Sequence, residues 1–181
     1  MHTTTLRVGF VPGVEPDRFM RRWRSGRREA WLELVPVPLS RQHEALAAGE
    51  IDMCFVRLPL TTEELHMVPL WEERAAVVVS GDDVLSLLDE VSAEDLEGET
   101  EIPSTHADDA ADRIAVAATG VGYTRVPLSL ARLHHRKDAA ARILRDAEPT
   151  RIALAWPRAD DDPVRQEFVG VVRGRTSRSS R

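Results

Sequence analysis

The feature that most constrains the fold is the alternation of apolar runs, glycine or proline loops and amphipathic segments across residues 6–59. The apolar run LRVGFV ends at Pro12 and Gly13, a basic amphipathic segment follows, and strand-like runs return at 31–37 and 51–58. Strands separated by helical segments are typical of βαβ units with a parallel sheet. The carboxyl ends of such strands meet at one sheet edge, where small molecules usually bind.

The same pattern of apolar runs and breakers extends over the rest of the chain. We expect strands at 6–11, 31–37, 51–58, 67–70, 75–79, 121–126 and 151–156. We expect helices at 15–25, 40–49, 92–98, 110–119, 127–133 and 162–172, with Ser40 as the N-cap of the second one. The acidic stretch 99–112 reads as a loop that leads into a helix. These elements predict an α/β protein.

The composition is that of a soluble globular protein. The 181 residues are 43% hydrophobic and 30% charged, and no apolar stretch has the roughly 20 residues of a membrane helix. The first residues have no cationic region followed by an apolar run, so we expect no secretory signal, no membrane partner and a cytoplasmic location. Cys54 is the only cysteine and lies in an apolar run, where a free cysteine is usually an inert small hydrophobe.

The net charge of −6 is unevenly distributed. Residues 173–181 carry four arginines and no acid, which leaves 20 basic and 30 acidic side chains before them. An acidic body disfavours nucleic-acid binding, so we interpret the tail as disordered, with tail-mediated nucleic-acid binding as the alternative. The first helix is also rich in arginine. We interpret these arginines as a solvated helix face or a salt-bridged subunit contact, because Glu15 and Asp17 lie nearby, with a phosphate or nucleic-acid site as the alternative.

Two histidine clusters are the candidates for metal binding, although clusters of this kind more often have a structural role. His106 lies with Asp108 and Asp109 in a predicted surface loop, and His134 and His135 point about 100° apart if they are helical. The chain has no GxSxG, P-loop or GxGxxG motif, and Cys54 has no obvious base. We therefore expect no enzyme, no metal and no cofactor.

Three loops at the predicted strand ends carry groups suited to a small anion. Pro12 and Gly13 close the first strand before a helix, whose free N–H groups attract anions. Ser40 offers a hydroxyl group at the second loop. Arg57 ends the third strand with a guanidinium that can bind a carboxylate in a bidentate manner. Each residue alone has a structural interpretation, and only their shared edge makes a site.

In their order, several segments resemble the effector-binding domain of LysR-type transcription regulators. The segments are LRVGFVPG, the LELV…EALAAGEIDMCFVRLP run, PLWEERAAVVVSGDD, VSAEDLEGE and AATGVGYTRVPLSLARL. The resemblance covers roughly residues 6–98 and 110–172.

The resemblance implies a type II periplasmic-binding-protein-like fold with two lobes of mostly parallel sheets. Lobe I would comprise residues 1–80 and 150–172, lobe II residues 81–149, and residues 173–181 a basic tail. The effector, a carboxylate or phosphate by the chemistry of Arg57, would bind between the lobes. The contacts carried over from the family are Pro12, Gly13, Leu39, Ser40, Arg57, Leu58, Gly120, Val121 and Gly122. The family's antiparallel dimers imply a homodimer or a partner regulator protein.

Two departures from the family pattern affect the functional expectation. Too few residues precede Leu6 for the family's helix-turn-helix, so we expect no direct DNA binding. Only about a dozen residues separate Glu99 from Ala110, where the family has several elements, so we expect a shortened second lobe and a reduced fold. We predict a non-enzymatic sensor of a small anionic metabolite. The alternative is a protein-interaction or oligomerisation module that has lost ligand binding.

Overall fold

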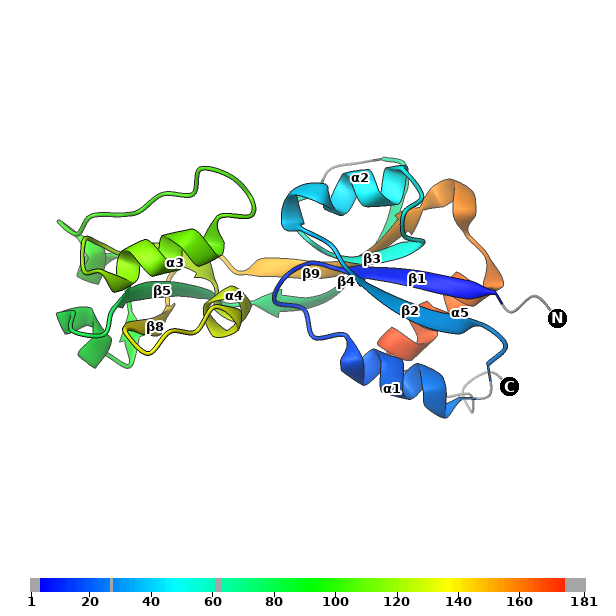
Figure 1. Cartoon of the computed structure of the whole chain (residues 1–181), viewed down its shortest axis with the longest axis horizontal. Coiled ribbons are helices and arrows are strands. Elements are labelled where there is room, and N and C mark those ends of the chain that lie inside the picture. Colours follow the sequence, from blue (N-terminus) through cyan, green and yellow to red (C-terminus); the bar gives the residue numbers. More distant parts are fainter. Residues whose placement is uncertain (1–3, 27, 61–62, 175–181) are drawn as a thin grey trace. The chain divides into compact units, whose positions relative to one another are not determined.

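The computed structural model describes residues 4–26, 28–60 and 63–174, and it divides the chain into two compact units. Unit 1 comprises Met1–Trp71 and Ile152–Arg181, and unit 2 comprises Glu72–Arg151. Each unit has its own sheet and its own helices (Figure 1). The chain therefore leaves unit 1 once, builds unit 2 as a continuous segment, and returns to complete unit 1.

Unit 1 is a mixed sheet with helices on both of its faces. Its elements in chain order are β1 (Thr5–Phe10), α1 (Asp17–Ser25), β2 (Trp31–Pro36), the 3-10 helix η1 (Leu39–Arg41), α2 (Gln42–Ala47), β3 (Met53–Arg57), β4 (Leu65–Glu73), β9 (Thr150–Pro157), η4 (Arg158–Asp160) and α5 (Pro163–Val172). The strand order is β2-β1-β3-β9-β4, with β1 parallel to both β2 and β3, and β9 antiparallel to β3. Helix α2 covers one face, and α1 and α5 cover the other (Figure 1).

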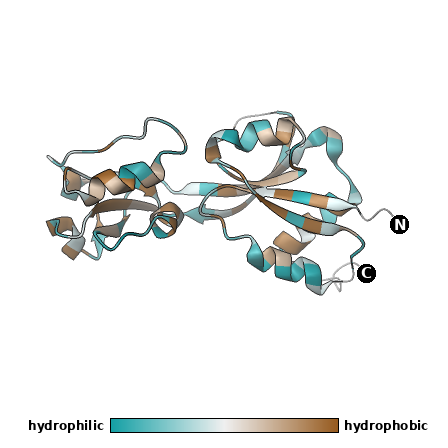
Figure 2. Ribbon diagram, in the orientation of Figure 1, coloured by the Kyte–Doolittle hydropathy of each residue, from teal (hydrophilic) through white to brown (hydrophobic). Residues whose placement is uncertain are grey.

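The core of unit 1 lies on both sides of β3, whose five residues are all buried. A strand covered on both faces needs an apolar sequence without alternation, and the run MCFV meets this requirement. On the α1 and α5 side, Phe55 packs against Phe19 and Phe168, with ring centroids 5.2 Å and 6.1 Å apart. The outer helix faces are hydrophilic, whereas the strands are predominantly hydrophobic (Figure 2).

Unit 2 is a smaller mixed sheet. Its elements are β5 (Ala75–Ser80), η2 (Val84–Leu87), β6 (Glu90–Val91), η3 (Glu94–Leu96), α3 (Ala110–Ala118), β7 (Thr124–Pro127), α4 (Leu128–Leu133) and β8 (Ala139–Leu144). The strand order is β6-β8-β5-β7, in which β5 is antiparallel to β7 and β8, and β6 is parallel to β8. The residues of β5 alternate between two cores: Ala76 and Val78 pack with α3 and α4, whereas Val77 and Val79 pack with Leu85 of η2.

The structure corrects three features of the predicted architecture. The sheets are mixed rather than mostly parallel, because the chain enters β9 antiparallel to β3 and places β5 between two antiparallel neighbours. The boundary falls after Trp71 rather than at residue 80, since β5 pairs only with strands of unit 2 among the described residues. Strands β6 and β8 were not predicted. Of the predicted basic tail, residues 175–181 lie outside the described residues.

Candidate functional site

The three parallel strands of unit 1 bring their carboxyl ends to one edge of the sheet. Phe10 of β1 is in register with Pro36 of β2 and with Phe55 of β3. The pairing continues one residue further, because Val37 N–H donates to the Phe10 carbonyl at 3.0 Å and Val11 N–H donates to the Phe55 carbonyl at 3.2 Å. The loops that follow β1, β2 and β3 therefore start side by side. We call these three loops, residues 11–13, 37–40 and 57–59, the rim.

Arg57 joins the first and third loops of the rim. The residue is only 5% exposed, and its Nη2 donates to the Pro12 carbonyl at 3.0 Å. The sequence predicted this guanidinium as a ligand group, and the structure adds that it fixes the loop between β1 and α1. A buried guanidinium also places a positive charge at the rim, which favours an anion there.

Gln42, the first residue of α2, fixes the other side of the rim and was not predicted from the sequence. Its side chain is buried, its Nε2 donates to the Arg57 carbonyl at 3.0 Å, and its Oε1 accepts from the Arg57 N–H at 2.9 Å. One amide thus satisfies both backbone groups of Arg57. Because the two residues are fifteen positions apart, no local sequence pattern signals this pair.

Ser40 lies at the rim but does not have the predicted capping role. Pro38 starts a 3-10 turn, closed by the Arg41 N–H donating to the Pro38 carbonyl at 2.9 Å, and α2 begins after it with Arg41 at the N-cap position. Ser40 is therefore an exposed residue inside the 3-10 turn. Leu39, before Ser40, and Leu58, the residue after the end of β3, are half-buried.

Gly13 has a φ of 91°, a conformation that residues with a side chain rarely adopt. The turn between β1 and α1 therefore depends on glycine at this position. The third loop contains a cis Leu58–Pro59 peptide bond. Pro12, Gly13 and Leu58 thus lie in loops of the rim, while ligand contact by them stays a prediction.

The predicted contacts Gly120, Val121 and Gly122 lie in unit 2, and the structure gives the two glycines structural roles. Gly120 has a φ of 87° and follows the C-cap of α3, with its N–H donating to the Ala117 carbonyl at 3.0 Å. A Cβ atom on Gly122 would lie 2.2 Å from the backbone oxygen of Thr100. Val121 between them is 60% exposed. Ligand binding by these three residues remains a prediction.

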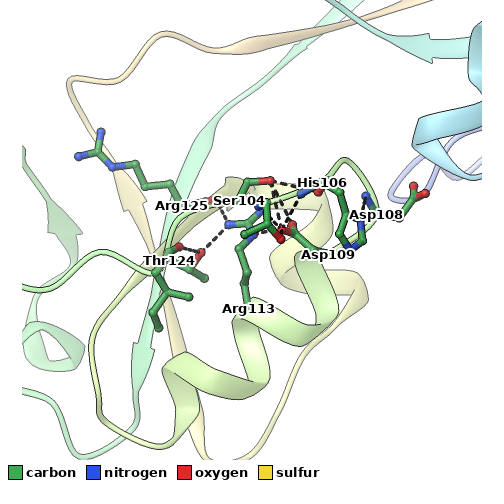
Figure 3. A network of polar contacts seen from close by, with 9 residues as sticks. Ser104, His106, Asp108, Asp109, Arg113, Thr124 and Arg125 are labelled. Atoms are coloured by element: carbon green, nitrogen blue, oxygen red, sulfur yellow. Dashed lines mark hydrogen bonds and ion pairs between the residues drawn. The ribbon is translucent and has the colours of Figure 1, made fainter.

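The loop with His106, Asp108 and Asp109 is held by a polar network (Figure 3). The buried Asp109 carboxylate accepts from Arg113 Nε at 2.7 Å and from the Thr105 N–H at 2.6 Å. Arg113 continues to Thr124 Oγ1 and to the Arg125 carbonyl on β7. The network ties the loop, α3 and β7 together. Among the described residues no group of histidine, cysteine and acidic side chains has the arrangement of a metal site.

The Asp109 carboxyl group is held in its charged form. Burial alone raises its pKa, but the hydrogen bonds from Arg113 and from the N–H groups of Thr105 and His106 outweigh burial, so the pKa lies below its usual range. In contrast, burial raises the pKa of the Cys54 thiol to about 12. Cys54 is fully buried in β3, so it is a protonated core side chain at neutral pH.

Replacement of Gln42 by leucine tests the support of the rim. The leucine side chain keeps the volume but removes both hydrogen bonds to Arg57, and we expect a loss of about 2–3 kcal/mol in the free energy of unfolding. The change is measured by urea unfolding followed through tryptophan fluorescence. The matched control Gln166→Leu changes an exposed glutamine on α5 and should lie within about 0.5 kcal/mol of the original chain. Equal losses in both variants would contradict the assigned role of Gln42.

The chain forms two units with mixed sheets, and both ends of the chain contribute to the first unit. This architecture is that of a two-lobed effector-binding domain. The chain belongs to the LysR substrate binding domain family, whose model matches residues 2–103. The members of this family are effector-binding domains of transcription regulators, which sense small molecules rather than catalyse reactions.

Among curated proteins, the chain is similar to the Hca operon transcriptional activator HcaR of Escherichia coli K12. The two are 22% identical over 199 residues, which cover 94% of this chain and 67% of HcaR. The matched length exceeds the 181 residues of this chain, so HcaR has residues within the matched region that have no counterpart here. In this structure the segment between η3 and α3 is a loop, with one isolated bridge between Glu101 and Tyr123.

The fold is that of solved LysR-type effector domains. The BenM effector binding domain with its effector benzoate superimposes with a TM-score of 0.74 at 21% identity, over 96% of this chain and 95% of that one. A C206 mutant of Corynebacterium glutamicum OxyR gives a TM-score of 0.74 at 18% identity, over 96% of this chain and 64% of that one. In the part of the chain that the structure describes, no helix has the length and apolar character needed to cross a membrane.

Proposed function

We propose that the chain is a sensor of a small anionic metabolite, which binds at the rim of unit 1. The observation that carries the proposal is that Arg57 links the first and third strand-end loops and is itself held by Gln42 of α2, the helix that follows the second loop. The guanidinium of Arg57 holds the Pro12 carbonyl, and its backbone is held by Gln42. A site whose loops are fixed in advance loses less conformational entropy when a ligand binds.

A carboxylate or phosphate is the ligand class that fits the rim. Arg57 supplies a positive charge, and Ser40 adds an exposed hydroxyl group that can donate a hydrogen bond to an anion. The related BenM domain was solved with its effector benzoate, which is a carboxylate. Gly120, Val121 and Gly122 of unit 2 are proposed as further ligand contacts.

The signal would pass to a partner subunit, either a second copy of this chain or a partner regulator protein in the cytoplasm. A ligand changes a conformational equilibrium only by its difference in affinity for the two states. We therefore propose that the ligand binds one arrangement of the domain better and that the partner detects the change. We propose that the residues which HcaR has and this chain lacks correspond to the loop before α3. Unit 2 would then be shorter than its counterpart in HcaR.

A thermal-shift screen against small carboxylates, phosphates and aromatic acids tests the proposal. A ligand present at 100 times its dissociation constant stabilises the folded chain by about 2.7 kcal/mol. For a chain of this size, this corresponds to a rise in Tm of roughly 5–10 °C. A screen without any stabilising compound contradicts the sensor proposal and favours the interaction module.

For a compound that stabilises the chain, the variant Ser40→Ala locates the site. We expect its dissociation constant to rise about tenfold, because a hydrogen bond to a charged ligand is lost. The matched control is Ser25→Ala, since Ser25 is also an exposed serine of unit 1 but lies at the end of α1. An unchanged affinity in Ser40→Ala would place the ligand elsewhere.

A further inference from the structure

A hollow in unit 1 lies beside α1 and shares no residue with the rim. It has a volume of about 380 Å³, and its walls include residues of α1, of β4 and of the end of α5. The residues that matter for its chemistry are Arg18, Phe19, Arg22, Trp71, Val172 and Arg173. The hollow thus combines three cationic side chains with aromatic and aliphatic ones.

The three arginines carry positive charge that no acidic side chain neutralises within the described part of the chain. Neither Glu15, which precedes α1, nor Asp17, its first residue, forms an ion pair with Arg18 or Arg22 there. Other arginines of unit 1 do form ion pairs. For example, Arg28 Nε lies 2.8 Å from Glu167 Oε1. In a protein with a net charge of −6, this local surplus favours an anion.

The aromatic rings give the hollow a flat apolar wall next to the charges. Phe19 and Trp71 are stacked with centroids 6.3 Å apart. The Cζ atom of Arg18 lies 4.6 Å from the Phe19 ring centroid and 5.1 Å from the Trp71 centroid. These cation–π contacts hold the guanidinium over the rings, where its N–H groups can bind an anion. Arg18 also lies in the first turn of α1, where the helix dipole adds positive potential.

We propose that this hollow binds a small organic anion with a flat apolar body. The negative group would contact Arg18 and Arg22, and the body would lie against Trp71. The size of the hollow fits a small molecule, and the acidic character of the whole chain disfavours a nucleic acid as its occupant. The chain would therefore have two anion sites in unit 1, one at the rim and one beside α1.

The test uses 2-naphthoate as the probe and the indole N–H signals of the four tryptophans in a ¹H–¹⁵N spectrum as the readout. The Trp71 signal is assigned as the one that disappears in Trp71→Phe. We expect this signal to shift and saturate with 2-naphthoate but not with the neutral 2-naphthamide. Pyrophosphate, which has the charge without the apolar body, should bind more weakly.

Two arginine variants separate a defined site from general attraction of anions. Arg22→Gln should raise the dissociation constant of 2-naphthoate about tenfold, because one charged contact is lost. Arg24→Gln removes the same charge from an exposed residue of α1 that does not line the hollow. This variant should change the dissociation constant of 2-naphthoate by less than about twofold. Equal effects of the two variants, binding of the amide, or no shift of Trp71 would overturn the proposal. Displacement of 2-naphthoate by a single-stranded oligonucleotide at lower concentration would also overturn it, in favour of nucleic acid.

Discussion

Replacing Phe55 with alanine is expected to lower the free energy of unfolding of unit 1 by about 3–5 kcal/mol. Phe55 is fully buried in the central strand β3 and contacts the rings of Phe19, Phe168 and Trp71. Its removal leaves a cavity between β3, α1 and α5, which these large neighbours cannot fill without moving. The backbone of Phe55 also accepts the hydrogen bond from Val11, so the change should loosen the rim as well.

Urea unfolding followed by tryptophan fluorescence measures this effect selectively. All four tryptophans, Trp23, Trp31, Trp71 and Trp156, lie in unit 1, so their fluorescence reports on that unit. The matched control is Trp31→Ala, which removes an aromatic ring that is 66% exposed and should alter stability by less than about 1 kcal/mol. A loss below about 1.5 kcal/mol in Phe55→Ala would show that Phe55 is not at the centre of the core.

The second large effect is expected in unit 2, for Asp109→Ala. The change removes the acceptor of Arg113 and of the loop N–H groups at Thr105 and His106, and it leaves a largely buried guanidinium without its carboxylate. Removing one partner of such a pair destabilises a protein by about 2–4 kcal/mol. The control Asp112→Ala changes an exposed acid on the same helix and should have an effect below about 0.5 kcal/mol.

The pH dependence gives this prediction a second readout. The pKa of Asp109 is lowered in the folded chain, so its contribution to stability is fully present above the pKa of the unfolded chain, about 3.9. It decreases as the pH falls through the lower, folded-state pKa. Calorimetric unfolding should therefore show a Tm difference between the original chain and Asp109→Ala that is constant near pH 7 and shrinks below about pH 4. A difference that does not change with pH would contradict the charged state of Asp109.

Much of unit 1 was predictable because its sequence pattern and its tertiary structure agree. The apolar runs before Pro12 and Pro38 form β1 and β2, and Gly49, with a φ of 68°, follows the end of α2 as expected. Strand β8 was missed because its sequence, AAARIL, is rich in alanine, which has a low intrinsic preference for strands. It becomes a strand because β5 and β6 pair with it on either side.

The site was predictable in its location and less so in its construction. Three strand ends placed Gly13, Ser40 and Arg57 at one edge, as the parallel pairing of β1 with β2 and β3 requires. The capping role of Ser40 was wrong, because Pro38 starts the turn two residues earlier. The linkage of Arg57 to Pro12 and Gln42 depends on which distant segments come together, and no local pattern contains this information.

The most direct test of the account is a ¹H–¹⁵N titration of the chain with the compound that stabilises it best in the thermal-shift screen. The account predicts saturable shifts concentrated on the backbone amides of the rim, namely those of Gly13, Leu39, Ser40, Arg57 and Leu58. It also predicts that Ser25, at the far end of α1, stays unchanged. Shifts confined to the surroundings of Trp71 and Arg22, with the rim amides unmoved, would contradict ligand sensing at the rim.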